Sequence, residues 1–255
     1  MESVIRLKDV GLKIGNREIL KDISFEVYGG EIFTILGGSG SGKTTITKCI
    51  VGLYKHTSGV IEVFGKDVSK LDQFHMDELR KAIGYVFQGA ALFDSLRVWE
   101  NVVFYHLEHG DFKEKELRDM ALKYLSMVGL SEKHLDLYPS ELSGGMKKRV
   151  GIARAIATEP KLVIYDEPTS GLDPITSRLI DELIVELRNR TGSTAIVVSH
   201  DMVSAFSISD RILVISEGQV VQIGTKEEIL NSDIPFVQEF LKKGLGELQE
   251  VRRSA

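Results

Sequence analysis

Residues 32–44 join an apolar, largely β-branched run to a glycine-rich loop that ends in a lysine and a threonine. The loop fits the pattern G-x-x-x-x-G-K-[ST], and an apolar stretch at residues 46–53 follows it. Glycines permit unusual dihedrals and a close approach of the ligand, and a strand, loop and helix in this order direct successive N–H groups at a phosphate. A glycine-rich surface loop is the alternative, but motif and flanks agree on a phosphate site. Its residues are Gly37, Gly38, Ser39, Gly40, Ser41, Gly42, Lys43 and Thr44, with Thr45 beside them.

The loop chemistry indicates a nucleotide bound with Mg²⁺. We expect Lys43 to reach the β- and γ-phosphates and the Thr44 hydroxyl to bind the metal ion. A loop of this kind occurs in kinases, GTPases and several classes of ATPase, so it leaves the reaction open.

A second apolar strand, which ends in two acidic residues, narrows the choice among these enzyme classes. Residues 162–165 are apolar and lead into Asp166 and Glu167, which alternation points to different sides of the strand end. Alone, two such acids are more often a turn or a helix cap. With the upstream loop, we expect Asp166 to hold Mg²⁺ directly or through water and Glu167 to take the proton from an attacking water. A GTPase needs the guanine-reading motif N/T-K-x-D after an apolar strand. The nearest match, Ser-Lys-Leu-Asp at residues 69–72, does not follow such a strand, so we set the GTPase class aside.

Composition excludes several other classes. The chain has 255 residues and a net charge of 32 − 37 = −5, with 43% hydrophobic and 27% charged residues, which is typical of a globular protein. The longest run without a charged side chain is residues 82–93, twelve residues, whereas a membrane-spanning helix needs about 20. We expect no secretory signal, and the single Cys49 fits a reducing compartment.

The acidic balance gives no reason to expect a nucleic-acid partner. A basic cluster is expected to be a solvated helix face or local phosphate support; it comprises Lys147, Lys148, Arg149 and Arg154.

The hydrophobic pattern predicts one continuous α/β fold with a doubly wound sheet. Residues 4–7 and 23–27 alternate as antiparallel strands do, and residues 195–198 repeat the buried run of residues 32–36. A helix is predicted from Pro174 to Gly192, with Ile175, Leu179, Leu183 and Leu187 at spacing four, and residues 89–159 are predicted to be a helical insertion.

Further motifs make the chain resemble the nucleotide-binding subunit of an ATP-binding cassette (ABC) transporter from about residue 4 to residue 241. They are Gln88, residues 170–173, residues 198–201, and a signature formed by Leu142, Ser143, Gly144, Gly145 and Met146. The resemblance implies a P-loop NTPase fold: a RecA-like core, an N-terminal antiparallel β-subdomain and an inserted α-helical signature subdomain at about residues 89–159. The ATP-binding domain would cover residues 4–240, with a C-terminal tail at residues 241–255.

The resemblance also assigns roles. Gln88 would touch Mg²⁺ and the attacking water, and His200 would contact the γ-phosphate and orient Glu167. The signature would meet ATP held by a second copy of the chain, and Asp173 would cross to the opposite phosphate loop. ATP and Mg²⁺ are thus the implied ligands, and the implied partners are a second copy and transmembrane permease subunits. The protein would lie in the cytoplasm, on the inner face of the cell membrane, held there through the permease.

Three positions depart from the general family pattern: Met146 replaces a frequent Gln, Gly38 a frequent Pro, and Ile14 an aromatic residue that stacks on adenine. We therefore expect weakened adenine selectivity. The motifs are most similar to the Mce/Mla-type branch, which moves phospholipids and implies an Mce-type substrate-binding partner. A small-solute importer, for instance for amino acids, is the alternative, and a soluble ABC ATPase outside transport is a more distant one. The spacing of Val237, Leu241, Leu245 and Leu248 fits either a helix on the partner cassette or an ordinary terminal helix.

Overall fold

The structure is a computed structural model that describes the backbone of residues 2–253 and the side chains of residues 2–244. The chain divides into two compact units. Unit 1 consists of Met1–Leu79 and Thr194–Ala255, and unit 2 is Arg80–Ser193. The predicted phosphate loop therefore lies in unit 1, and the acidic pair and the signature lie in unit 2.

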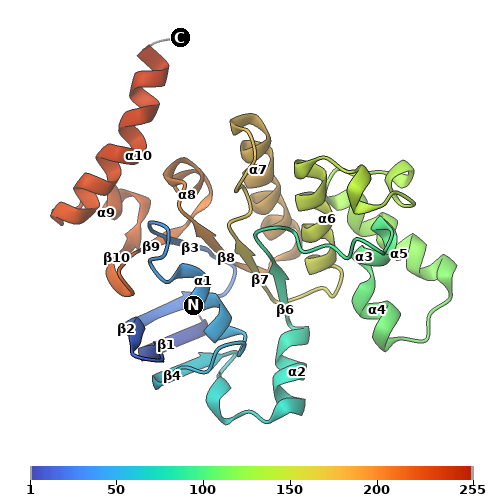
Figure 1. The fold of residues 1–255 in the computed structure, drawn as a ribbon, viewed down its shortest axis with the longest axis horizontal. Coiled ribbons are helices and arrows are strands. Elements are labelled where there is room, and N and C mark those ends of the chain that lie inside the picture. The colour runs from blue at the N-terminus through green and yellow to red at the C-terminus, as the bar shows by residue number, and fades with distance from the viewer. Residues whose placement is uncertain (1, 254–255) are drawn as a thin grey trace. The chain divides into compact units, whose positions relative to one another are not determined.

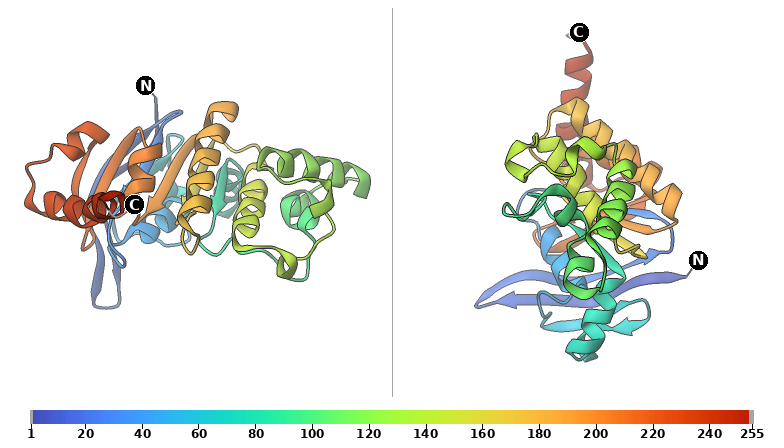
Figure 2. Two further views of the ribbon diagram at one scale, coloured as in Figure 1. Left: turned by 90° about the horizontal axis from the view of Figure 1, so that it is seen from above. Right: turned by 90° about the vertical axis from the view of Figure 1, so that its right-hand side faces the viewer.

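Unit 1 begins with an antiparallel sheet in the order β2-β1-β4-β5. The hairpin of β1 (Ser3–Ile14) and β2 (Arg17–Tyr28) is long (Figure 2), and it turns at Gly15, whose φ is 59°. The short strands β4 (Ser58–Val63) and β5 (Lys66–Asp67) complete this sheet. The antiparallel strands predicted at residues 4–7 and 23–27 are confirmed, because β1 and β2 pair through Leu7 and Phe25.

The second sheet of unit 1 carries the loop. Strand β3 (Ile32–Leu36) is parallel to β8 (Thr194–Ser199) and to β9 (Arg211–Ser216), and β10 (Gln219–Thr225) is antiparallel to β9. Every residue of β3 and β8 is buried, as their continuous apolar sequences predict. Helix α1 (Lys43–Ile50) begins directly after the loop that follows β3.

Two helices at the C-terminal end of unit 1, α8 (Met202–Ile208) and α9 (Lys226–Leu230), contact this sheet, and a third, α10 (Pro235–Arg253), packs on α8 and α9 (Figure 1). Val237 and Leu241 of α10 are buried in a cluster with Met202 of α8. The other two residues of the predicted stripe, Leu245 and Leu248, lie outside the described side chains. The segment between β5 and unit 2 forms η1 (Val68–Lys70) and leads into α2 (Gln73–Lys81).

Unit 2 contains two parallel strands, β6 (Ile83–Val86) and β7 (Leu162–Asp166). The predicted helix after Pro174 is α7 (Pro174–Thr191), capped by Asp173 and ended by Gly192 in the left-handed conformation. Two residues of its spacing-four stripe face solvent, since Ile175 is 76% and Leu179 45% exposed. The buried face of α7 comprises Ile180, Leu183, Ile184 and Leu187.

The remainder of unit 2 is helical, as predicted for residues 89–159, all of which are described and none of which is in a strand. Helices α3, α5 and α6 pack on one another (Figure 1), with Leu117, Ala121 and Leu125 of α5 buried. The elements are α3 (Val98–Val102), α4 (Phe104–His109), α5 (Glu114–Met127), η2 (Glu132–His134), η3 (Pro139–Glu141) and α6 (Gly144–Ile156).

Among the described helices of both units, none combines the length and the apolar character that crossing a membrane requires.

Candidate nucleotide-binding site

The phosphate loop of unit 1 is shaped by glycines at particular positions. Gly42 has a φ of 107°, which side-chain-bearing residues rarely adopt, and a Cβ on Gly37 would lie 2.4 Å from the Ile215 carbonyl oxygen. Gly38 differs, because a Cβ there would meet nothing within 4 Å. The protein's own packing therefore explains Gly37 and Gly42, and it leaves Gly38 free to vary.

Lys43 is bent back over this loop. Its side chain is 6% exposed, and Nζ donates to the carbonyl oxygens of Gly37 at 2.8 Å and Gly38 at 2.9 Å. The ammonium is thus held above the loop backbone, at the start of α1, whose first N–H groups have no acceptor within the helix. The Ser41 Oγ is buried and has no hydrogen-bond partner among the described residues. A phosphate oxygen would satisfy this hydroxyl and the helix N–H groups together. Thr44 and Thr45 are half-buried in the first turn of α1.

His200 leaves the same sheet beside the loop. Leu36 of β3 pairs with Ser199 of β8, and the Gly37 N–H donates to the Ser199 carbonyl at 3.3 Å. Parallel strands end at one edge of a sheet, so His200 and the phosphate loop begin side by side. His200 is exposed.

The acidic pair of unit 2 ends β7, where Asp166 is 5% and Glu167 9% exposed. The Tyr85 hydroxyl donates to Asp166 Oδ2 at 3.2 Å. Glu167 has a φ of 50°, an uncommon conformation for a residue with a side chain, and such conformations cluster at functional sites.

Gln88 follows β6 in the same unit, and its Nε2 donates to Ser170 Oγ at 3.4 Å. The main chain of Gln88 and that of Glu167 share one donor, because Lys148 Nζ bonds to the Gln88 carbonyl and lies 3.2 Å from the Glu167 carbonyl. Unit 2 therefore joins Gln88 and Glu167 through a residue of α6.

This contact corrects the expectation that the basic cluster is solvated. Lys148 is 6% exposed, and Arg154 donates at 2.7 Å to the Ala90 and Ala91 carbonyls. Burial lowers the pKa of both side chains. At Lys148 the negative charges of Glu167 and Asp166 act in the opposite direction and raise the pKa. These contacts differ from the prediction, although the apolar spacing of α6 indicates that part of its basic face turns inward.

The signature occupies the start of α6. Ser143 is the N-cap, and its Oγ accepts from the Met146 N–H at 3.3 Å. Ser143 and Gly144 are exposed and Leu142 is buried. A Cβ on Gly145 would lie 2.8 Å from the Thr176 methyl group, so the helix start passes close to α7.

Asp173 caps α7 and accepts hydrogen bonds from the Thr176 hydroxyl and from the Ile175 and Thr176 N–H groups. These bonds, that of the hydroxyl first, lower the pKa of its carboxyl. Asp173 therefore acts as a helix cap in the single chain.

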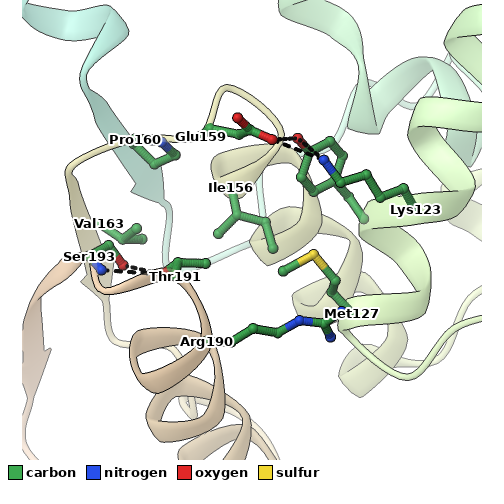
Figure 3. A pocket seen from close by; sticks show the side chains of 10 residues that line it. Lys123, Met127, Ile156, Glu159, Pro160, Val163, Arg190, Thr191 and Ser193 are labelled. Carbon is green, nitrogen blue, oxygen red and sulfur yellow. Dashed lines mark hydrogen bonds and ion pairs between the residues drawn. The ribbon is translucent and has the colours of Figure 1, made fainter.

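Two of the cavities that the described residues line lie outside these contacts. One, of about 330 Å³, adjoins the phosphate loop in unit 1 and is lined by Arg17, Glu18, Ile19, Lys21, Gly40, Glu217 and Gly218. Ile14 is not part of this lining, and its side chain is 54% exposed. The other, of about 320 Å³ in unit 2, lies among α5, the end of α6 and the end of α7 (Figure 3) and contains none of the predicted site residues. The Lys123–Glu159 ion pair at 2.9 Å lies at one side of it.

A glycine-rich loop that ends in Lys43 and Thr44 and joins the buried strand β3 to helix α1 defines a P-loop nucleotide-binding protein. The comparisons specify the family: residues 20–170 match the ABC transporter family, and the chain belongs to it.

Two curated relatives have similar identity and different roles. The methionine import ATP-binding protein MetN of Clostridioides difficile is 40% identical over 226 residues, which cover 89% of this chain and 70% of MetN. The intermembrane phospholipid transport system ATP-binding protein MlaF of Haemophilus influenzae is 39% identical over 241 residues, covering 94% of this chain and 91% of MlaF.

Solved structures agree on the fold. A dimeric post-hydrolysis state of the ATP-binding cassette MJ0796, bound to ADP and Pi, has a TM-score of 0.80 and 34% identity, covering 87% of this chain and 98% of that one. CbiO1 of Clostridium perfringens, part of the ABC transporter complex cbiONQ, has a TM-score of 0.83 and 30% identity, covering 99% and 100%. The predicted fold class is confirmed, and the chain is an ATP-hydrolysing subunit of the ABC transporter type.

Proposed function

We propose that two copies of the chain close head to tail over two molecules of Mg-ATP and drive a separate membrane permease. The observation that carries this proposal is the signature: Ser143 and Gly144 are exposed at the start of α6, where N–H groups and the helix dipole suit a phosphate. The phosphate loop in unit 1 already provides such a start at α1, so one chain holds two different phosphate-binding ends. The dimeric MJ0796 structure supports pairing of cassettes.

Within each composite site, Lys43 and the loop N–H groups would hold the β- and γ-phosphates. Thr44, Gln88 and Asp166 would hold Mg²⁺, because hydroxyl, amide and carboxylate oxygens are the hard ligands this ion accepts. The ion, when bound, neutralises charge that develops on the phosphates. Glu167 would accept the proton of the attacking water, and His200 would contact the γ-phosphate and orient that water. Asp173 would cross to the loop of the partner copy.

The test of the catalytic role is Glu167→Gln. Removing a general base lowers the rate about 10²- to 10⁴-fold, so we expect turnover to be lost while ATP binding persists. Size-exclusion chromatography with Mg-ATP is expected to show a trapped dimer. Glu182→Gln, an exposed position on α7, is the matched control. Undiminished ATPase in Glu167→Gln would refute the assignment of the base.

The permease would bind unit 2 near Gln88 and so hold the protein at the inner face of the cell membrane. Aromatic side chains are exposed in this part of unit 2, with Phe87 39% and Phe93 43% exposed. Arg154 lies over the Phe93 ring and also bonds to the chain just after Gln88, which connects this surface to the site. Co-purification with a permease tests this step, and substitution of both rings by serine is expected to abolish it.

For the transported substrate we propose phospholipid, as in the Mce/Mla branch, with an Mce-type protein as a further partner. Support comes from residues 142–149 with Met146, and from the MlaF relative. The MetN relative favours an amino-acid importer as the second candidate. Purification of the assembly and mass spectrometry of bound lipid distinguish them: co-purified phospholipid supports the first, and a solute-binding partner without lipid supports the second. If no membrane partner is captured at all, a soluble ABC ATPase becomes the better assignment.

A further inference from the structure

Lys148 is a buried cation of α6 to which the proposed mechanism gives no part. Its Nζ donates to the carbonyl of Glu167 at 3.2 Å and to the carbonyl of Gln88. Both acceptors belong to the main chain of residues proposed to act on the attacking water. A long basic side chain that is only 6% exposed is unusual, because a buried ammonium must have its charge compensated.

The backbone at Glu167 needs a restraint of this kind. Its φ of 50° is unfavourable for a residue with a side chain and persists only where the surroundings enforce it. A donor fixed at the Glu167 carbonyl restrains the peptide that follows this residue. The backbone dihedrals of Glu167 also set the direction in which its carboxylate points, so Lys148 constrains the general base through the main chain.

Helix α6 carries Lys148 at a fixed distance from the signature. Ser143 caps the helix by accepting from the Met146 N–H, and Lys148 follows Gly144 by four residues, about one helical turn. Further along, Arg154 donates to the Ala90 and Ala91 carbonyls, whose residues also have positive φ values of 62° and 48°. The helix that begins at the signature is thus bonded at two points to the segment that starts with Gln88.

We infer that Lys148 is a positioning residue that links the signature helix to Glu167 and Gln88, so that nucleotide docking on the signature and orientation of the general base are coupled within one chain. This inference rests on the proposed function of those two residues. It assigns Lys148 no contact with ATP.

The test is Lys148→Met, which keeps the length of the side chain and removes the donor. We expect kcat to fall about 10- to 100-fold, since a misplacement of about 1 Å at a catalytic group can cost 10²-fold. KM and the affinity for a fluorescent ATP analogue are expected to change less than about threefold, because the phosphate loop is in the other unit. The matched control is Lys147→Met, because no described residue forms a hydrogen bond or an ion pair with the Lys147 side chain.

Three outcomes decide the matter. A fall in kcat confined to Lys148→Met supports the inference, and an unchanged kcat overturns it. Loss of affinity and of kcat together, with a lower unfolding temperature, indicates a purely structural role and also overturns it. If Glu167→Gln abolishes turnover but Lys148→Met does not alter it, this inference fails while the proposed function stands.

Lys148→Arg provides a second readout. Arginine keeps a cationic donor at this position. We expect Lys148→Arg to retain more of the wild-type kcat than Lys148→Met does. A kcat as low as that of Lys148→Met contradicts a positioning role for the donor of this side chain.

Discussion

The phosphate loop of unit 1 and the Gln88–Glu167 region of unit 2 are each held by a buried lysine, but the two lysines span different distances along the chain. Lys43 donates to carbonyls five and six residues away. Lys148 donates to carbonyls 19 and 60 residues away. The lysine of the phosphate loop is therefore bonded within its own local sequence, whereas the lysine of the region proposed for catalysis bonds to distant segments.

Removal of the local lysine should have the largest effect. Lys43→Ala deletes an ammonium whose charge-assisted hydrogen bonds are worth about 1.5–3 kcal/mol each. Two such bonds to phosphate correspond to a loss of about 10²-fold or more in ATP affinity. Titration with a fluorescent ATP analogue measures this loss of affinity. Lys48→Ala in the same helix is the control, since the Lys48 ammonium lies over the Tyr54 ring. Wild-type affinity in Lys43→Ala would mean that the loop binds phosphate without its lysine.

Removal of a hydrogen bond between distant segments should instead lower the stability of unit 2 and leave phosphate binding by the loop unchanged. Arg154→Met removes the donor to the carbonyl of Ala91, an exposed residue, and to the carbonyl of Ala90, a residue that is 1% exposed. An unsatisfied buried group such as the Ala90 carbonyl costs about 1–3 kcal/mol. We expect a lower free energy of unfolding in urea and faster hydrogen exchange in residues 88–93, with unchanged ATP affinity. Reduced affinity together with protected residues 88–93 would contradict the division into local and distant control.

A change at Ile14, the position expected to govern selectivity for adenine over guanine, should have the smallest effect. The cavity beside Gly40 has no aromatic residue among its described lining, and Ile14 is exposed. We expect GTP and ATP to be hydrolysed at equal rates. Ile14→Tyr should strengthen ATP binding by at most about tenfold, the value of about 0.5–1.5 kcal/mol for an aromatic stack. A strong preference of the wild-type protein for ATP would refute the prediction.

The contrast between local and long-range interactions also explains which features could be predicted from the sequence. The strand of residues 32–36, the loop and the helical insertion follow from apolar runs, glycines and periodicity, all of which are local signals. Strand β9 and strand β10 were not predicted, although the apolar run of residues 212–215 and Gly218 mark them. The acceptors of Lys148 and Arg154 could not be predicted, because a basic side chain on a helix gives no sign of an acceptor 60 or more residues away in the chain. The positive φ of Glu167 could not be predicted either, because glycine is the residue whose presence in a sequence indicates such a dihedral.

The roles of the site residues and the composite site remain predictions. The composite site depends on two copies exchanging signatures, so variants that damage opposite halves can complement each other. Lys43→Ala removes the loop's lysine, and Ser143→Arg places a bulky cation at the exposed start of α6.

The most direct measurement is the ATPase rate of these two variants, each alone and then mixed in equal amounts. We predict that each is inactive alone and that the mixture recovers roughly a quarter of the wild-type rate, because half of randomly formed dimers hold one intact site of two. A mixture that stays inactive, although chromatography shows that the two variants have paired, would contradict a site shared between copies of the chain.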